Sequence, residues 1–125
     1  MALSIYGEGR VANPDNSILK YIDIPYNRIV IKSFAEDATQ DIYDGDNSKA
    51  ARRLPMELHP KARRLLDLLN SAGRLDDLRI PPGNWLEALK GNLKGLHSIR
   101  INDQWRIIFR WVDGDAEDVR IVDYH

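Results

Sequence analysis

The sequence predicts an α+β fold, with two N-terminal helices packed on one face of an antiparallel β-sheet. Apolar residues in the first half of the chain recur at the spacing of one helical face. Apolar and polar residues in the second half alternate with the period of two that is typical of half-buried strands. Short turns between those strands favour a meander, and helices that precede such a sheet favour packing on one of its faces.

The first 29 residues differ from the rest of the chain. Glycines, prolines and the sequence NPDN (13–16) interrupt them, and no helical or strand period persists. We expect residues 1–29 to form a loosely ordered N-terminal extension and residues 30–125 to form one domain. A chain of 125 residues has room for one hydrophobic core. At the boundary, the β-branched residues 29–31 (IVI) predict a short buried strand.

Two helices are expected next. Ser33 is the candidate N-cap of the first helix, and Glu36 three positions later would complete a capping box. This helix would run from Phe34 to about Tyr43 and end at the DGDN sequence of residues 44–47. The second helix is defined by apolar residues along one face and would end at a glycine C-cap. These residues are Leu58, Ala62, Leu65, Leu66, Leu69 and Gly73.

Four strand segments are expected after the sequence PPG at residues 81–83. The first covers residues 85–89, and the last contains Val119, Ile121 and Val122. In the second and third, alternate residues would face the core. They are His97, Ile99 and Ile101, followed by Trp105, Ile107, Phe109 and Trp111. Turns at residues 102–103 and 113–115 would connect these strands into a meander.

The composition excludes several classes of protein. No apolar stretch approaches the roughly 18 residues of a membrane-spanning helix, and no signal or transit sequence opens the chain. The absence of cysteine excludes disulfide and thiolate chemistry. The histidines His59, His97 and His125 are widely spaced; we expect His59 to be exposed and His97 to lie in or beside the core. The expectation is a cytoplasmic protein without a membrane partner, cofactor or metal.

Basic residues gather in one part of a nearly neutral chain. The net charge is −1, but residues 84–112 contain five basic residues and two acidic ones. Strand alternation places Arg100, Arg106 and Arg110 on the outward face, and Lys90 and Lys94 lie in the preceding connection. Arginine binds two phosphate oxygens at once, and lysine adds a compact charge. This pattern favours a surface for a phosphate backbone, although a solvated strand face with scattered charge is the alternative.

The chain ends with Asp123, Tyr124 and His125 directly after a strand. A terminal histidine carries its own α-carboxylate, which favours the imidazolium and makes the side chain a candidate general acid. A tyrosine at such a place can stack on a base or donate a hydrogen bond to a phosphate oxygen. The alternative is a frayed terminus without a role.

Four stretches carry a more specific signal. They are residues 75–84 (LDDLRIPPGN), 86–91 (LEALKG), 98–107 (SIRINDQWRI) and 121–125 (IVDYH). Together they resemble HigB-type toxins of the RelE/ParE superfamily, which belong to type II toxin–antitoxin systems. The resemblance extends over residues 30–125 and implies two helices packed on a twisted antiparallel sheet, the RelE/ParE-like microbial RNase fold.

The resemblance implies a ribosome-dependent, metal-independent mRNA endonuclease (an mRNA interferase) that inhibits translation and needs no cofactor. Its partners would be mRNA in the ribosomal decoding site, 30S ribosomal RNA and a helix-turn-helix, HigA-like antitoxin. It would meet promoter DNA only through that antitoxin. The family's lysine, strand arginine and terminal pair fall on Lys90, Arg106, Tyr124 and His125.

Two positions depart from the family pattern. Glu87 stands where some members have a histidine, which leaves the identity of the general base open. Family chains usually begin at the first strand, and residues 30–34 (VIKSF) take that place here. An upstream start assignment would account for residues 1–29, which mass spectrometry of the native protein can test.

Such an enzyme uses the 2′-hydroxyl of its substrate as the nucleophile, and it leaves a 2′,3′-cyclic phosphate and a 5′-hydroxyl. Lys90 and Arg106 would stabilise charge on the phosphorane. Tyr124 would orient the nucleotide, and His125 would protonate the leaving oxygen. The expected supporting contacts to RNA come from Lys94, Arg100, Arg110 and Asp123, with Glu87 or Asp123 assisting the reaction.

Two other functions remain open from the sequence. A ParE-like toxin would share the fold but inhibit DNA gyrase and cut no RNA. A nucleic-acid-binding regulator without catalysis is the second alternative, and the absence of a recognisable recognition helix weighs against it. Lys90 and the terminal Tyr124–His125 pair favour the nuclease.

Overall fold

The computed structural model describes residues 29–124, so nearly all of the expected N-terminal extension (1–29) and the predicted general acid His125 lie outside the described residues. The two helices, α1 (Asp37–Asp44) and α2 (His59–Ser71), precede all four strands in chain order. The strands are β1 (Glu87–Ala88), β2 (Leu96–Arg100), β3 (Trp105–Val112) and β4 (Asp115–Asp123). The predicted α+β class is therefore confirmed.

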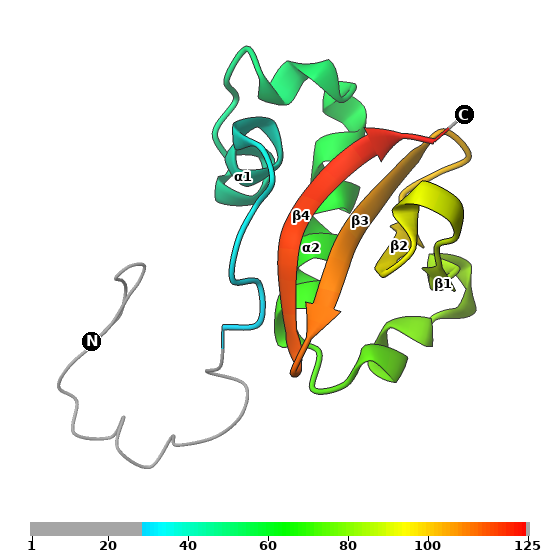
Figure 1. Ribbon diagram of the computed structural model, residues 1–125. Helices are drawn as coiled ribbons and strands as arrows, with labels where there is room; N and C mark the ends of the chain where they lie inside the picture. Colours follow the sequence, from blue (N-terminus) through cyan, green and yellow to red (C-terminus); the bar gives the residue numbers. More distant parts are fainter. Residues whose placement is uncertain (1–28, 125) are drawn as a thin grey trace, which may run out of the picture.

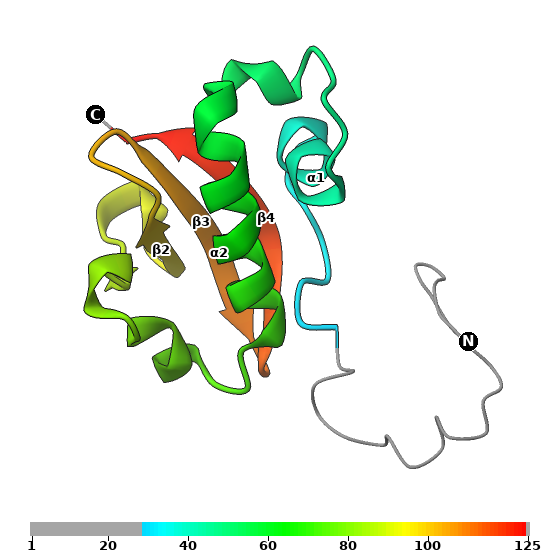
Figure 2. The same cartoon turned by 180° about the vertical axis from the view of Figure 1, so that it is seen from behind.

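The four strands form one twisted antiparallel sheet in the order β1-β2-β3-β4 (Figure 1). Seen from behind, α2 crosses β3 and β4 on one face of this sheet, and α1 lies beside the β4 edge and packs on α2 (Figure 2). The face of the sheet opposite α2 faces the viewer in Figure 1. We call it the open face and define it by Arg100, Arg106, Ile108, Arg120 and Val122.

The hydrophobic core lies between α2 and the sheet. The alternation predicted for β2 and β3 is confirmed at Ile99, Ile101, Trp105, Ile107 and Phe109, which are buried there with one face of α2, whereas His97 and Trp111 are half-buried. The largest fully buried side chains are Ile42, Leu54, Leu65, Leu66, Leu69, Leu78, Ile99, Ile101, Ile107, Ile108, Phe109 and Ile121. Among the strand residues in this set, Ile99, Ile107, Phe109 and Ile121 belong to the core cluster, and Ile108 lies on the open face, as the period of two in a strand requires.

The start of the first helix was predicted wrongly. Helix α1 begins at Asp37, three residues later than expected, and Ser33 does not cap it. Instead, residues 30–35 run parallel to β4, with single bridges from Ile31 to Ala116 and from Phe34 to Val119. The Ser33 hydroxyl accepts a hydrogen bond from the Asp118 amide at 2.9 Å. Pairing with β4 thus takes the residues that local sequence assigned to a helix cap.

The sequence predicted the end of α1 correctly but not the end of α2. Gly45 adopts the left-handed conformation (φ 79°) after α1, as the DGDN sequence suggested. Helix α2 ends one residue earlier than predicted, at an extended Ala72, and the Gly73 amide donates to Asp77 at 2.9 Å. Gly73 therefore does not cap α2, and the Asp77 carboxylate accepts from the Gly73 and Arg74 amides at the start of the 3₁₀ turn Leu75–Arg79.

Two further predictions were wrong. Only residues 87–88 of the expected strand at 85–89 form β1, because Trp85 adopts a left-handed conformation (φ 47°) that breaks the strand. His59 is buried, and its Nε2 lies 2.9 Å from the Leu54 carbonyl oxygen, so it closes the turn before α2. His97 is half-buried and stacks on Phe109, in agreement with the prediction.

Candidate active site

The strand register places the predicted site residues in two neighbouring rows on the open face. Arg100 of β2 is opposite Arg106 of β3, which is opposite Val122 of β4. In the next row, Glu87 of β1 is aligned with Ser98, Ile108 and Arg120. Residues directly opposite each other in an antiparallel sheet point to the same face. The predicted cation pair and Glu87 therefore share one surface.

Arg106 is the residue around which this surface is organised. Its side chain is only 6% exposed although it carries a charge. Nη1 donates to the Glu87 carboxylate at 2.5 Å, and Nη2 donates to the Trp85 carbonyl at 2.9 Å. The guanidinium also lies 5.1 Å from the ring centroid of Tyr124. These contacts fix the guanidinium from three directions, and the cation over an aromatic face adds a further favourable term.

The Arg106 guanidinium has N–H groups that are not hydrogen-bonded within the described residues. An arginine has five N–H groups, and two of those on Arg106 are bonded within the described residues. Its Nε is buried and has no hydrogen-bond partner among those residues. A buried donor without a partner is costly, so this group offsets part of the stabilisation that the other contacts of Arg106 provide.

Arg100 lies next to Arg106 and is held differently. Its guanidinium is 4.9 Å from the ring centroid of Trp85 and forms an ion pair with Asp103. Trp85 itself is 57% exposed, because its left-handed backbone turns the ring away from the core and over the sheet. The stack keeps Arg100 at the surface, where it can bind a phosphate with the part of the guanidinium edge that Asp103 does not use.

These side chains surround one cavity of about 330 Å³, which we call the arginine cavity. Two arginines and two aromatic rings contribute to its walls. Its lining is Trp85, Glu87, Arg100, Asn102, Asp103, Arg106 and Tyr124. Tyr124 follows directly on β4, whose last residue Asp123 pairs with Trp105 at the start of β3, and the Tyr124 amide donates to the Gln104 carbonyl. The cavity can accept an anionic group between the two cations and a flat group against the rings.

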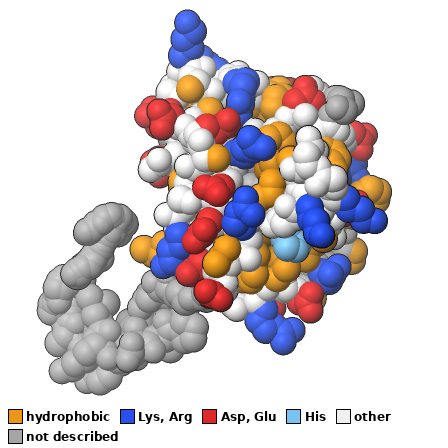
Figure 3. Space-filling model, in the orientation of Figure 1, with side chains coloured by type: hydrophobic (Ala, Val, Ile, Leu, Met, Phe, Trp, Pro, Cys, Tyr) orange, Lys and Arg blue, Asp and Glu red, His pale blue; other side chains and the backbone are white. Residues whose placement is uncertain are grey.

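The remaining predicted residues of the described part of the chain do not line the arginine cavity. Lys90 and Lys94 are exposed in the connection between β1 and β2, on either side of the 3₁₀ turn η7 (Gly91–Leu93). Arg110 lies four residues along β3 from Arg106, with its Nε 3.7 Å from the Asp118 carboxylate. Asp123 accepts a hydrogen bond from the Gln104 side chain at 3.0 Å. Basic side chains are interspersed with apolar ones over this view of the molecule (Figure 3).

Sequence reasoning missed two residues on this surface. Trp85 was assigned to a strand, and only its backbone conformation reveals that its ring covers Arg100. Arg120 was passed over in the last strand. The alternation in β4, where the neighbours Val119 and Ile121 are buried, would have placed Arg120 on the open face.

The described residues can also be compared with the requirements of a proton-transfer group, a metal site and a membrane span. Burial, with the charge of Arg79 adding to it, lowers the pKa of His97, which lies apart from the arginine cavity. Among residues 29–124, no group of three or more histidine, cysteine or carboxylate side chains is placed to hold a metal ion. Within the same residues, no helix is long and apolar enough to cross a membrane.

The family follows from the sequence match that covers this surface. Residues 32–125 match the model of the HigB-like toxin family, described as the RelE-like toxin of the type II toxin–antitoxin system HigB. The chain belongs to this family. The match spans both arginines of the cavity, Tyr124 and the two lysines, so these residues lie within the region that defines the family.

Two relatives support the assignment to the HigB-like family. The chain is 46% identical to Toxin HigB-1 of Vibrio cholerae serotype O1 over 83 residues, which cover 66% of this chain and 85% of that protein. It is 42% identical over 40 residues to Endoribonuclease HigB of Proteus vulgaris, covering 32% of this chain and 44% of that one. The family and these relatives favour a HigB toxin over a ParE-like gyrase inhibitor. An antitoxin is therefore the partner that membership of a type II system implies.

A solved structure agrees with the HigB-like family at the level of fold. The YoeB dimer from Staphylococcus aureus superposes with a TM-score of 0.50 at 21% identity, covering 77% of this chain and 98% of that one. This likeness supports the arrangement of two helices and an antiparallel sheet.

Proposed function

We propose that this toxin is an endoribonuclease that cuts messenger RNA in the ribosomal decoding site, with its activity in residues 30–125. The observation that supports the proposal most directly is Arg106, a nearly buried cation that Glu87, the Trp85 carbonyl and the Tyr124 ring hold at the wall of a cavity. A charge fixed in advance lowers a reaction barrier, because it needs no reorganisation when charge develops on the substrate.

The proposed reaction uses the substrate's own nucleophile. The 2′-hydroxyl oxygen attacks the adjacent phosphorus, the bond from phosphorus to the 5′-oxygen breaks, and the products are a 2′,3′-cyclic phosphate and a 5′-hydroxyl. A base takes the proton from the 2′-hydroxyl, and an acid gives a proton to the leaving 5′-oxygen. The protein then has to align the backbone for in-line attack and stabilise the phosphorane.

Each of these tasks, except removal of the 2′-hydroxyl proton, has a candidate side chain. Arg106 and Lys90 stabilise the phosphorane, and His125 protonates the leaving oxygen. The ring of Tyr124 orients the scissile nucleotide, since it already lies against the Arg106 guanidinium. Lys94, Arg100 and Arg110 contact the flanking phosphates. Asp123 provides a further polar contact to the RNA.

Glu87 has a defined partner in this proposal. Its carboxylate is 51% exposed and accepts from Arg106, so it holds the catalytic cation in place. We assign Glu87 to positioning Arg106. The base that accepts the proton of the 2′-hydroxyl is then supplied within the ribosome-bound complex. The toxin acts in the bacterial cytoplasm with 30S ribosomal RNA beside it. A helix-turn-helix, HigA-like antitoxin silences it and provides its only link to promoter DNA.

Growth and RNA cleavage test the proposal directly. We expect Arg106→Ala and His125→Ala each to relieve growth arrest when the toxin is induced, with cleavage slowed by roughly 10²–10³ or more. Arg64→Ala, on the exposed side of α2, is the matched control and should remain toxic. Primer extension on cellular messages measures the cuts, and circular dichroism checks folding.

The proposal fails if both variants fold and still cut messages at the rate of the parent chain. DNA breaks with intact messages would point instead to gyrase inhibition.

A further inference from the structure

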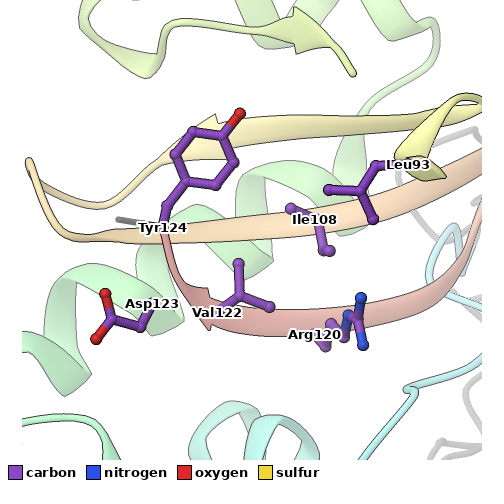
Figure 4. Close-up of a pocket in the computed structure, with 6 residues that line it drawn as sticks. All are labelled: Leu93, Ile108, Arg120, Val122, Asp123 and Tyr124. Carbon is purple, nitrogen blue, oxygen red and sulfur yellow. The ribbon is translucent and has the colours of Figure 1, made fainter. Parts of the chain in front are cut away.

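A second hollow of about 330 Å³ lies on the open face beside the arginine cavity. We call it the apolar hollow; its lining is Leu93, Ile108, Arg120, Val122, Asp123 and Tyr124. Tyr124 and Leu93 lie on either side of Ile108, and Val122 and Arg120 line it from β4 (Figure 4). The Asp123 carboxylate points away from Ile108 and Leu93 (Figure 4). The floor and both side walls are therefore apolar or aromatic.

The hollow adjoins the arginine cavity through a shared wall. The Tyr124 ring lines both, and its contact with the Arg106 guanidinium joins them. Val122 is opposite Arg106, and Arg120 lies two residues further along β4, about 7 Å away at the usual strand rise. A group bound in the hollow is therefore within one nucleotide's reach of a phosphate held by Arg106.

Two charged residues, Arg120 and Asp123, contribute to the lining of the apolar hollow, and Asp123 accepts a hydrogen bond from Gln104. Arg120 has no hydrogen bond or ion pair with any other side chain among residues 29–124, in contrast to Arg100 and Arg106. It is half-buried on the open face, where Ile108 is its neighbour across the strands. An unpaired guanidinium above an apolar floor favours a ligand that is flat and apolar on its faces but carries acceptors at its edge.

We propose that the apolar hollow holds one nucleobase of the RNA, next to the scissile phosphate, and that Arg120 makes guanine the preferred base. This inference rests on the proposed function and adds a specificity determinant to it. A nucleobase meets all three features, because its faces stack on Tyr124, its body covers Ile108 and Val122, and its edge faces Arg120. Guanine presents two adjacent acceptors, O6 and N7, which match the arginine fork. The hollow is at the lower end of the size range of small-molecule sites, as a single base requires.

The test separates binding of the base from cleavage of RNA. The full-length protein is titrated with GMP, AMP, CMP and UMP, while NMR follows the methyl groups of Leu93, Ile108 and Val122. We expect GMP to shift these signals most strongly. Arg120→Met keeps the aliphatic stem but removes the fork, and it should weaken GMP binding about 5- to 150-fold without a similar loss for UMP. Arg64→Met on α2 removes a free arginine elsewhere and should leave all four titrations unchanged.

The inference is overturned if the four nucleotides shift these methyl groups equally, or if inorganic phosphate alone reproduces the GMP effect. It is also overturned if Arg64→Met weakens GMP binding as much as Arg120→Met does. Cleavage maps of RNA then provide an independent readout, in which Arg120→Met should lose a preference for guanine while still cutting. GMP bound in the hollow of a protein that cuts no RNA would support this site and contradict the proposed function. RNA cleavage without base selectivity in the hollow would support the proposed function and contradict this site.

Discussion

At the scale of single residues, the open face is organised by cations whose partners differ. Arg106 is nearly buried and paired with Glu87, Arg100 is stacked on Trp85, and Arg120 is unpaired among the described residues. A buried charge is tolerated only when hydrogen bonds and an opposite charge compensate for lost hydration. The ion pair with Glu87 explains why Arg106 can remain charged while it is nearly buried at the wall of the cavity. The same contact fixes the orientation of its guanidinium.

Glu87 gives a prediction that distinguishes positioning from proton transfer. Glu87→Gln retains an oxygen that accepts from Arg106 but cannot act as a base, and we expect it to keep most of the cleavage rate. Glu87→Ala leaves Arg106 without its carboxylate and should slow cleavage by at least tenfold, with a loss of about 1–2 kcal/mol in stability. Single-turnover kinetics against pH measure both variants. If Glu87→Gln instead loses the acidic limb of the pH–rate profile, where the rate rises as a base deprotonates, Glu87 is the general base.

His97 predicts a pH dependence of stability. Burial, with Arg79 adding to it, lowers the pKa of His97 from its ordinary 6.5, so the unfolded chain binds a proton more readily than the folded one. Stability from this residue is present above about pH 6.5 and is lost as the pH falls below that value. His97→Phe should keep the stack on Phe109 and flatten the change in unfolding free energy between about pH 5 and 7. Urea unfolding at several pH values checks this; an unchanged slope would contradict it.

At the scale of secondary-structure elements, residues 30–35 determine how the β4 edge is covered. They lie parallel to β4, and the Asn70 side chain of α2 accepts hydrogen bonds from the amides of Val30 and Ile31 at 3.0 and 2.9 Å. One side-chain oxygen therefore joins α2 to the segment that pairs with β4. Exposed strand edges promote aggregation, so this cover also protects the sheet.

Asn70→Ala should release this segment. Two backbone donors lose their acceptor, and we expect a loss of about 1–3 kcal/mol in unfolding free energy. Asn70→Asp is the matched control, since it retains an oxygen at the same position and should lose less. Denaturant unfolding measures both variants, with hydrogen exchange of Val30 and Ile31 as a local readout. Equal stabilities of Asn70→Ala and the parent chain would show that the segment is held by its apolar contacts alone.

At the scale of the whole molecule, the fold separates a structural face from a binding face. Helix α2 buries its leucines on one side of the sheet, which leaves the other side free for the cavity, the hollow and the cations around them (Figures 1 and 2). A chain with a net charge of −1 can still bind RNA, because local charge determines phosphate binding.

This separation predicts which lysines affect the salt dependence of RNA binding. A contact between one cation and one phosphate of single-stranded RNA contributes about 0.7 to the slope of log affinity against log salt. We expect Lys94→Ala to lower the slope by about that amount, measured with a single-stranded RNA whose 2′-hydroxyls are methylated to prevent cleavage. Lys61→Ala, on the helix side, should leave it unchanged. Equal effects of the two variants would mean that the RNA does not prefer the open face.

The sequence by itself determined the class of fold, the inward residues of β2 and β3, and the shared face of Arg100 and Arg106. These features depend on periodicity, which is local and survives in a linear reading. The motifs also determined the family, because they are long and specific.

Only the tertiary structure decided the rest. The pairing of residues 30–35 with β4 overrode the helix cap at Ser33, and the left-handed Trp85 moved an aromatic ring from an expected strand to a cavity wall. The partners of Arg106 come from β1, from the preceding turn and from the end of β4. Hydrogen bonds and ring contacts between distant segments depend on three-dimensional packing, and no spacing along the chain encodes them.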